Sequence, residues 1–436
     1  MVSPAAKGIQ TESSLFLCRL KALLDRSLLL RIINLQNNTF TGPIPQGMGR
    51  LRRLEAIVFN NNSLGGGIPT NLSQCINLNN LNLIDNELTG SIVPEIASLL
   101  NLQFLGLSDN MLAGTIPPFL GNLTYLLQLS LRNCSLQGEI PESLAQLRRL
   151  RLLNVNENDL IGSIPLVLFN LSSVEIFRFG FNKLHGNIPA DVGSTLPKLR
   201  HLDLAINHFT GVLPAFLSNS SLIENLYISS NNFRGTMIDL TKLSYLQMLL
   251  VANNRLNGDI GSILSSLTNC TNLEVLSLGD NPFTGSLPDS MGNLSNHVWF
   301  LRINQNQLSG SIPSSIENLV GLTTLYATIN NLKGPIPSSI GKLHNLQRIS
   351  LSKNRLNEMP FSLGNLTLLN NLYLRLNNLS VSIPQNLGNC TNLLVLDLSE
   401  NNLSRSMHPE IIKLSSISIG LDQSDNVLTG LISPEY

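Results

Sequence analysis

The sequence predicts an α/β repeat solenoid of about 17 repeats, a superhelix that carries a parallel β-sheet on its concave face. Three observations predict this fold. A motif recurs every 23 to 27 residues through almost the whole chain of 436 residues. Each copy contains L-x-L or a similar apolar pair, the alternation typical of a short strand with one buried side. Charged residues are only 13% and aromatic residues 5%, so a core built mostly of leucine is expected.

The copies align on one position, which we call the anchor. It follows L-x-L-x-x and is an asparagine in every copy but one, where a cysteine takes its place. The 17 anchors are Asn38, Asn62, Asn86, Asn110, Cys134, Asn158, Asn182, Asn207, Asn231, Asn254, Asn281, Asn306, Asn330, Asn354, Asn377, Asn401 and Asn426. Because one copy cannot bury its apolar side alone, each copy is expected to stack on its neighbours.

Each part of a copy has a structural reason, as in "LRRLRLLNVNENDLIGSIP" at residues 147–165. The alternating leucines predict a short strand that buries one face. The anchor side chain is expected to hydrogen-bond backbone groups that close stacking would otherwise leave unpaired. The glycine permits a bend, and Ile-Pro predicts an extended segment with a fixed φ.

Irregular copies mark local changes. The copy between Asn254 and Asn281 is 27 residues long, and its segment "GDIGSILSSLTNCTNL" at 258–273 predicts an added helical turn. The last copy has Gln423 where a core leucine is expected, and no polar cap follows it. The repeat array over residues 28–436 is therefore predicted to be truncated at its C-terminus. Residues 1–27 are predicted to be a degenerate N-terminal cap or the remnant of a leader.

Charge and hydropathy exclude several classes of protein. The formal net charge is zero, so the basic footprint of a nucleic-acid-binding protein is absent. No run of 18 or more apolar residues occurs, and no transmembrane helix is predicted. The apolar stretch at 15–18 is interrupted by Arg19 and Lys21, so no secretory signal peptide is read in this sequence.

The cysteines and histidines predict neither a metal site nor catalysis. Cys75, Cys270 and Cys390 each lie 11 residues before an anchor, where other copies have leucine, so they are interpreted as small buried hydrophobic residues. Cys75 and Cys270 are eight repeats apart, about 38 Å at strand spacing, which excludes a disulfide between them. No metal-ligand spacing, phosphate loop, nucleophile elbow or kinase motif is present. We therefore expect no enzyme activity, no catalytic residue and no cofactor.

The repeat resembles a known family. "GSIPSSIENL" at 310–319 and "GPIPSSIGKL" at 334–343 are similar to the plant-type leucine-rich repeat of extracellular receptor kinases and receptor-like proteins. "SLTNCTNLEVLSLGDNPFTGSLPDSMGNLSN" at 266–296 resembles the subfamily that contains the flagellin, elongation-factor and bacterial-blight resistance receptors. This resemblance implies a secreted, N-glycosylated ectodomain that senses peptides or microbial proteins, followed by a membrane helix and a Ser/Thr kinase. The kinase and membrane segments are absent from this sequence.

A binding surface is predicted on the concave face. On each strand, the position between the two core leucines and the next exposed position point away from the core. The candidate ligand-binding residues at these positions are Arg178, Asp203, Tyr227, Arg302, Asn304, Tyr326, Tyr373 and Arg375. Arginine and tyrosine dominate binding hot spots. The alternative is a solvated polar face with a few scattered aromatic residues.

Thirteen N-x-[ST] sequons are candidate glycosylation sites if the chain is secreted. The principal candidates are Asn71, Asn122, Asn170, Asn219, Asn269, Asn293, Asn365 and Asn389. The alternative is that "GNLT" and "NNLS" serve only packing and turns.

The function predicted from these observations is recognition of a peptide or protein ligand, without catalysis, by an ectodomain related to plant immune receptor kinases. The resemblance also implies a co-receptor with a leucine-rich-repeat ectodomain, and a location outside the cell or at the plasma-membrane surface. Two alternatives stay open at this point: a truncated or mis-predicted receptor fragment without independent function, and a secreted inhibitor of cell-wall-degrading enzymes.

Overall fold

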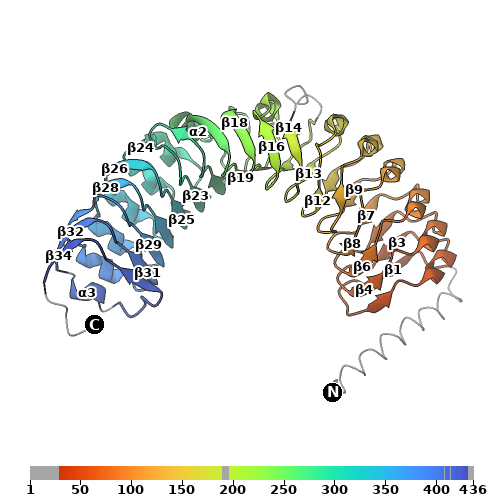
Figure 1. Ribbon diagram of the computed structural model, residues 1–436, viewed down its shortest axis with the longest axis horizontal. Helices are drawn as coiled ribbons and strands as arrows, with labels where there is room; N and C mark the ends of the chain where they lie inside the picture. Colours follow the sequence, from red (N-terminus) through yellow and green to blue (C-terminus); the bar gives the residue numbers. More distant parts are fainter. Residues whose placement is uncertain (1–28, 189–195, 407, 413, 431–436) are drawn as a thin grey trace, which may run out of the picture. The chain divides into compact units, whose positions relative to one another are not determined.

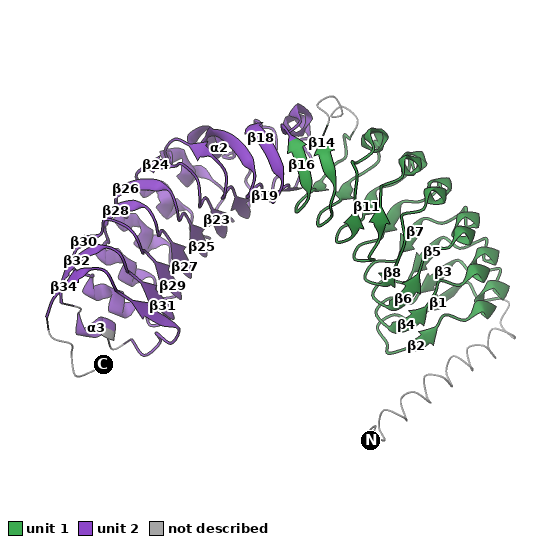
Figure 2. Ribbon diagram, in the orientation of Figure 1, with its two compact units in different colours: residues 1–210 green, residues 211–436 purple. Residues whose placement is uncertain are grey.

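The computed structural model describes residues 29–188, 196–406, 408–412 and 414–430 (Figure 1). The predicted cap or leader remnant at residues 1–27 lies outside the described residues. The chain divides into two compact units, unit 1 at Met1–Thr210 and unit 2 at Gly211–Tyr436 (Figure 2). Each unit is described by itself.

The repeats form 17 short parallel strands, which confirms the predicted solenoid of about 17 leucine-rich repeats. In unit 1 they are β1 Ile32–Asn34, β3 Ala56–Val58, β5 Asn80–Asn82, β7 Phe104–Gly106, β9 Gln128–Ser130, β11 Leu152–Asn154, β13 Ile176–Arg178 and β15 His201–Asp203. In unit 2 they are β17 Asn225–Tyr227, β19 Met248–Leu250, β21 Val275–Ser277, β23 Phe300–Arg302, β25 Thr324–Tyr326, β27 Arg348–Ser350, β29 Asn371–Tyr373, β31 Val395–Asp397 and β33 Gly420–Asp422. Within each unit, every such strand pairs in parallel with that of the next repeat.

After a turn that follows each main strand, the chain forms a second strand of two to five residues. These strands are β2 Thr41–Pro43, β4 Ser63–Gly66, β6 Glu87–Gly90, β8 Met111–Leu112, β10 Gln137–Gly138, β12 Asp159–Leu160, β14 His185–Asn187, β16 His208–Gly211, β18 Asn232–Thr236, β20 Arg255–Asp259, β22 Phe283–Thr284, β24 Ser309–Gly310, β26 Asn331–Pro335, β28 Arg355–Glu358, β30 Ser380–Val381, β32 Asn402–Arg405 and β34 Val427–Leu428. They form separate small sheets. Between a main strand and the second strand that follows it, the chain turns at a residue of positive φ just before the anchor, such as Asn61 between β3 and β4.

The helical part of the described repeats is mostly 3₁₀. The 3₁₀ helices are η1 Gln46–Arg50, η2 Thr70–Gln74, η3 Pro94–Ser98, η4 Pro118–Asn122, η5 Glu142–Gln146, η6 Leu166–Asn170, η8 Ala215–Asn219, η9 Asp289–Asn293, η10 Ser314–Asn318, η11 Ser338–Lys342, η12 Phe361–Asn365 and η13 Gln385–Asn389. The α-helices are α2 Ile260–Ser266 and α3 Pro409–Ile412. The added helical turn predicted in the long copy is confirmed as α2, whose first turn is capped by Asp259 accepting from the backbone N–H of Ser262.

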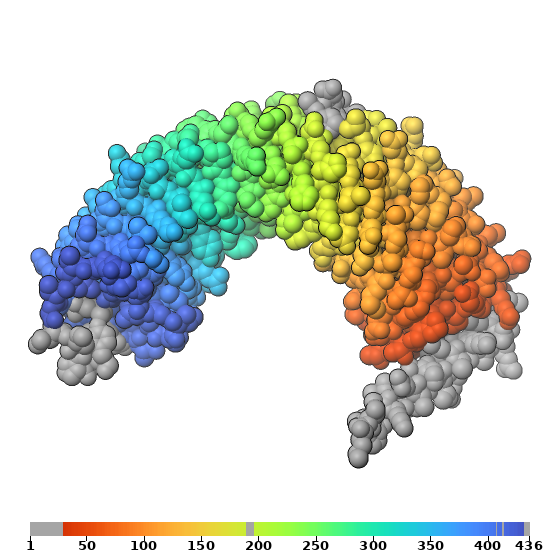
Figure 3. Space-filling view, in the orientation of Figure 1, coloured from red at the N-terminus to blue at the C-terminus, as the bar shows by residue number. Residues whose placement is uncertain are grey.

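The core of each repeat is filled by the leucines at alternate positions. Along residues 371–374, at β29, exposure alternates. Leu372 and Leu374 are fully buried, while Asn371 and Tyr373 are partly exposed. The space-filling view shows that successive repeats of each unit lie directly against one another in chain order (Figure 3). Each repeat therefore buries its apolar side against its neighbours, as expected for a solenoid.

The anchor side chains join neighbouring repeats. Nδ2 of Asn330 donates to the carbonyl oxygen of Ile303 in the preceding repeat at 3.0 Å. Its Oδ1 accepts from the backbone N–H of Leu308 at 3.0 Å. Where a cysteine replaces the asparagine, Cys134 Sγ donates to the carbonyl oxygen of Leu107 at 3.2 Å, the same inter-repeat contact. The predicted hydrogen-bonding role of the anchor is confirmed.

Candidate functional site

The outward side of the main strands forms the surface that we call the strand face. It consists of the residues on either side of each strand's buried central residue, together with the turn that follows. In β23, Leu301 is fully buried, while Phe300 and Arg302 are half-buried and point outward. The strand face therefore begins one position earlier in each strand than the sequence analysis assigned.

A depression of about 510 Å³ lies on the strand face of unit 2. It is lined by Ser229, Ser230, Leu250, Ala252, Asn253, Ser277, Asp280, Phe300 and Arg302. Four of these nine residues are small, so the repeats of β17, β19 and β21 form the floor of the depression. The larger side chains of Phe300 and Arg302, from β23, line the side of the depression. The lining joins apolar surface, hydroxyl groups and one ion pair, a combination suited to binding a peptide side chain and backbone.

A polar network holds Arg302 at the edge of this depression. Its Nη2 contacts Asp280 Oδ2 at 2.5 Å, and its Nε donates to Asn304 Oδ1 at 2.7 Å. Asn304 Nδ2 also donates to Asp280 Oδ2 at 3.3 Å. Gly279 permits this arrangement, since a Cβ there would lie 2.4 Å from Asn304 Oδ1. The predicted residues Arg302 and Asn304 thus lie together, with Asp280 as a partner that the sequence analysis missed.

Three aromatic side chains, which we call the aromatic row, lie next to Arg302. The ring of Phe300 is 5.7 Å from that of Trp299 and 5.8 Å from that of Tyr326, both edge to face. Such pairs are favourable because the positive ring edge meets the negative ring face. Tyr326 was predicted, and Trp299 and Phe300 were missed. The alternation of strand side chains was the signal that could have identified Phe300, because residues two apart share one face.

The other predicted residues of unit 2 have partners on the strand face. Tyr227 Oη contacts Met248 Sδ at 2.9 Å, and Tyr373 Oη accepts from Asn371 Nδ2 at 3.3 Å. Arg375 is bound through two of its nitrogens to Glu400 of the next repeat. Tyr227 and Tyr373 thus add half-buried aromatic surface to the face, and Arg375 adds a paired charge.

The predicted residues of unit 1 lie side by side on β13 and β15, where Arg178 and Asp203 are in register. Asp203 is only 7% exposed and accepts from Asn156 Nδ2 at 2.6 Å, across the gap that Gly180 leaves between them. Burial raises the pKa of the Asp203 carboxyl, opposed by its hydrogen bonds and by Arg178. Asp203 is therefore a member of an internal network, while Arg178 is the more accessible of the two.

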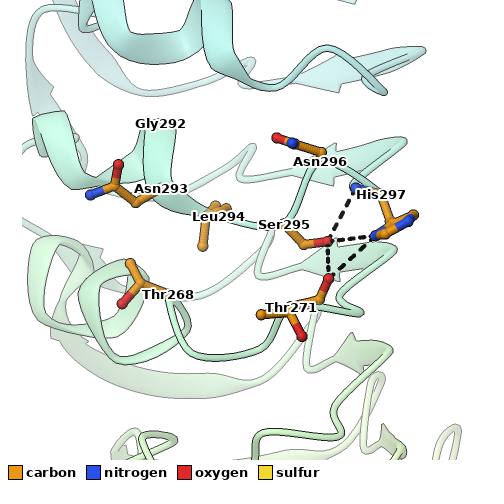
Figure 4. Close-up of a pocket in the computed structure, with 8 residues that line it drawn as sticks. All are labelled: Thr268, Thr271, Gly292, Asn293, Leu294, Ser295, Asn296 and His297. Carbon is orange, nitrogen blue, oxygen red and sulfur yellow. Dashed lines mark hydrogen bonds between the residues drawn. The ribbon is translucent and has the colours of Figure 1, made fainter.

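The eight principal sequon asparagines are all exposed. Six of them end 3₁₀ helices, namely Asn122, Asn170, Asn219, Asn293, Asn365 and Asn389. Figure 4 shows one, Asn293, beside a depression of about 400 Å³. Ser295, the third residue of that sequon, is buried and its hydroxyl donates to the carbonyl oxygen of Thr271 at 2.7 Å. Attachment of glycans stays a prediction.

Within the described ranges, no group of three or more His, Cys, Asp and Glu side chains could hold a metal ion. No helix in the same ranges is long and apolar enough to cross a bilayer. The described cysteines are buried and unpaired in disulfides, which confirms the reading of Cys75, Cys270 and Cys390 as small core residues. Cys18 lies outside the described residues.

Comparisons with known proteins assign this repeat fold to a family. The family described as "Leucine-rich repeat region" matches residues 256–418, and "Leucine Rich Repeat" matches residues 29–51, 101–123, 125–147 and 198–220. The structure is similar to the leucine-rich-repeat ectodomain of the Arabidopsis receptor kinase HAESA, solved with an IDA peptide hormone. The TM-score is 0.85 and the identity 33%, over 93% of this chain and 72% of that chain. This chain belongs to the leucine-rich-repeat family of plant receptor ectodomains.

Other members of this receptor family are also similar. The ectodomain of the Arabidopsis thaliana receptor kinase GASSHO1/SCHENGEN3, solved with CASPARIAN STRIP INTEGRITY FACTOR 2, has a TM-score of 0.84 and 34% identity over 93% of this chain and 51% of that chain. Receptor-like protein 41 of Arabidopsis thaliana is 35% identical over 31% of this chain, but only 15% of its own length is matched. The receptor kinase-like protein Xa21 of Oryza sativa subsp. japonica is 42% identical over 63 residues, which are 14% of this chain and 6% of that protein.

Proposed function

We propose that this leucine-rich-repeat chain recognises a peptide or a protein segment on the strand face of unit 2, without catalysing a reaction. The observation that carries the proposal is the meeting of three features in neighbouring repeats: the depression, the aromatic row and the Arg302–Asp280–Asn304 network. Aromatic and arginine side chains held rigidly around a recess are the residues that carry most binding energy in protein interfaces.

The similar receptors support this choice of ligand class. The HAESA ectodomain was solved with the peptide hormone IDA, and PEPR1 with AtPEP1. HAESA was also solved with IDA together with the co-receptor SERK1. By analogy we propose a peptide ligand for this chain, a leucine-rich-repeat co-receptor as a further partner, and a place outside the cell or at the plasma-membrane surface. The resemblance of residues 266–296 to the subfamily of immune receptors adds the proposal of a role in plant defence.

The test uses the chain's own fluorescence. Trp299 is the single tryptophan of the sequence, is 43% exposed, and lies in the aromatic row. Pools of randomised dodecapeptides are titrated into the 436-residue protein, and a bound peptide is expected to change the emission of Trp299. Phe300→Ala and Tyr326→Ala are expected to weaken the selected peptides about 10-fold or more, as for aromatic hot-spot residues.

The matched control is Phe361→Ala, since Phe361 begins η12, is 65% exposed and is not on the strand face. The control is expected to bind as the wild type does. Far-ultraviolet circular dichroism confirms that each variant is folded. If folded Phe300→Ala and Tyr326→Ala proteins bound every selected peptide with unchanged affinity, the strand-face assignment would be wrong.

A further inference from the structure

The charged residues of the strand face in unit 2 change sign along the repeats. Arg348, in β27, and Lys353, in the turn that follows, are exposed. Among the described residues, neither side chain has an ion-pair partner. The repeat of β27 therefore presents two free positive charges a short distance beyond the aromatic row.

The next repeats carry the opposite charge. Asp397 and Asp422 are in register on β31 and β33, and Glu400 and Asp425 follow in the turns. Arg375, which lies just after β29, is already bound to Glu400. Asp422 also accepts from the backbone and the hydroxyl of Ser424, and these bonds together with Arg375 lower its pKa. The Asp422 carboxylate is therefore ionised at neutral pH and repels an acidic ligand.

Strand spacing fixes the separation of these features. The floor of the depression includes Ser277 on β21, and Arg348 is on β27, three strands further along the parallel sheet. Parallel strands lie about 4.8 Å apart, so this separation is about 14 Å. An extended peptide that crosses the strands advances about 3.3 Å per residue, which makes the separation roughly four residues.

We propose that the strand face of unit 2 selects an extended peptide with a large apolar side chain in the depression and an Asp or Glu about four residues away, over Arg348 and Lys353. The inference rests on the proposed function and specifies its ligand. The acidic repeats of β31 and β33 set a boundary, because a second acidic group placed there meets like charge. The depression buries the apolar side chain of the peptide. Arg348 and Lys353, as unpaired cations, determine where the peptide carries a charge and that this charge is negative.

The experiment sorts a phage-displayed library of randomised dodecapeptides on the 436-residue protein. Wild-type protein is expected to enrich peptides in which Phe, Trp, Leu or Met is followed or preceded by Asp or Glu at a spacing of three to five residues. The R348Q/K353Q double variant is expected to retain the apolar preference and to lose the acidic one. K333Q/R355Q is the charge-matched control, since Lys333 and Arg355 are exposed on β26 and β28 rather than on the strand face.

A selected peptide is then synthesised in two forms, one with its Asp or Glu and one with Asn or Gln in that place. Each form is titrated into the protein while the emission of Trp299 is recorded. The change from acid to amide is expected to cost about 5- to 10-fold in affinity for wild type and for K333Q/R355Q, and about 2-fold or less for R348Q/K353Q. Raising the salt concentration is expected to reduce the difference in affinity between the acid and amide peptides for the wild-type protein.

Two failures are distinguishable. If peptides bind at the aromatic row but show no preferred acidic position, or if R348Q/K353Q keeps that preference, the charge inference is wrong and the proposed function stands. If no peptide binds with a saturable affinity that depends on Phe300, the proposed function fails and the inference fails with it. Enrichment of peptides with basic residues at this spacing would also overturn the inference.

Discussion

At the scale of single residues, the anchor side chains replace hydrogen bonds that stacked turns cannot make with water. Asn354 is 8% exposed, and its Nδ2 donates to the carbonyl oxygens of Ala327 and Leu351 at 2.9 and 3.0 Å. Its Oδ1 accepts from the backbone N–H of Leu332 at 3.0 Å. One side chain thus satisfies a backbone group of its own repeat, at Leu351, and two of the preceding repeat, at Ala327 and Leu332.

Asn354→Ala is expected to lower the free energy of unfolding by about 2–4 kcal/mol, because buried N–H and C=O groups lose their partners. Asn357→Ala is the control, since Asn357 is exposed on β28 of the same repeat. It is expected to change the stability by less than about 0.5 kcal/mol. Urea unfolding followed by circular dichroism measures both. Equal stability of the two variants would contradict the role assigned to the anchor.

The buried thiols make stability depend on pH in the alkaline range. Burial raises the pKa of Cys390 from 9.0 to about 11, and its Sγ donates to the carbonyl oxygen of Leu363 at 3.4 Å. Between these two values the unfolded chain has lost the thiol proton while the folded chain keeps it. The free energy of unfolding therefore falls as the pH rises above about 9 and approaches 11.

Wild-type protein is expected to lose about 1 kcal/mol more stability between pH 8 and pH 10 than Cys390→Ala, which has no thiol at this position. Comparing the two proteins at each pH removes the contribution of tyrosines and lysines that titrate in the same range. The measurement is the urea midpoint at pH 8, 9 and 10. A constant difference between the two proteins over this range would show that the thiol is not the group responsible.

At the scale of elements, close contact between neighbouring 3₁₀ helices depends on glycine. Gly364 lies in η12, and a Cβ built there would be 2.1 Å from the carbonyl oxygen of Asn386 in η13. Gly49, Gly121 and Gly341 have the same contact with the next repeat. A backbone atom cannot move aside as a flexible side chain can, so any larger residue must push the two repeats apart.

Gly364→Ala is therefore expected to destabilise the protein by about 3 kcal/mol, mainly through this overpacking. Gly420→Ala is the matched control, because no atom lies within 4 Å of a Cβ at that position. The control is expected to be neutral or slightly stabilising, since alanine restricts the unfolded chain. Thermal unfolding of the two variants measures the difference, and a control as unstable as Gly364→Ala would count against the overpacking argument.

The main strands and their core leucines could be predicted from the sequence, because their alternation is repeated 17 times. The 3₁₀ form of the helices could not, since "PSSIGKL" and its counterparts satisfy both helical types over so few residues. The turn before each anchor takes a positive φ, which Asn and Asp favour, but tertiary packing imposes it also on Ile206 and Ile329. The conformational preferences of isoleucine alone would not have predicted a positive φ at either position.

The candidate site was predictable in part for a similar reason. Arg302 and Tyr326 were identified because they lie between core residues of their strands. The depression beside them depends on the size of residues in four neighbouring repeats, which a single repeat does not reveal. The burial of Asp203 likewise depends on Gly180 and on Asn156, two repeats away along the sheet. Such features follow from stacking rather than from local pattern.

At the scale of the whole molecule, the repeat organisation limits how far a local change spreads. Strand and helix contacts in each unit join neighbouring repeats, so stability is approximately a sum of repeat terms and nearest-neighbour terms. The buried thiols Cys75, Cys134, Cys270 and Cys390 are distributed along the chain and report on different repeats. Cys390 directly follows η13, the helix that Gly364 contacts. Local opening at this contact should therefore reach Cys390 before it reaches the other thiols.

Gly364→Ala is expected to accelerate alkylation of Cys390 by about 10-fold or more under native conditions, since a destabilised pair of repeats opens more often. Cys270 of the same unit and Cys75 of unit 1 are expected to change by less than about 2-fold, because several intact repeats separate them from the substitution. Iodoacetamide labelling at pH 8, resolved for each peptide by mass spectrometry, measures all the rates in one sample. Equal acceleration at Cys75, Cys270 and Cys390 would mean that the chain opens globally, and the nearest-neighbour description would have to be abandoned for this protein.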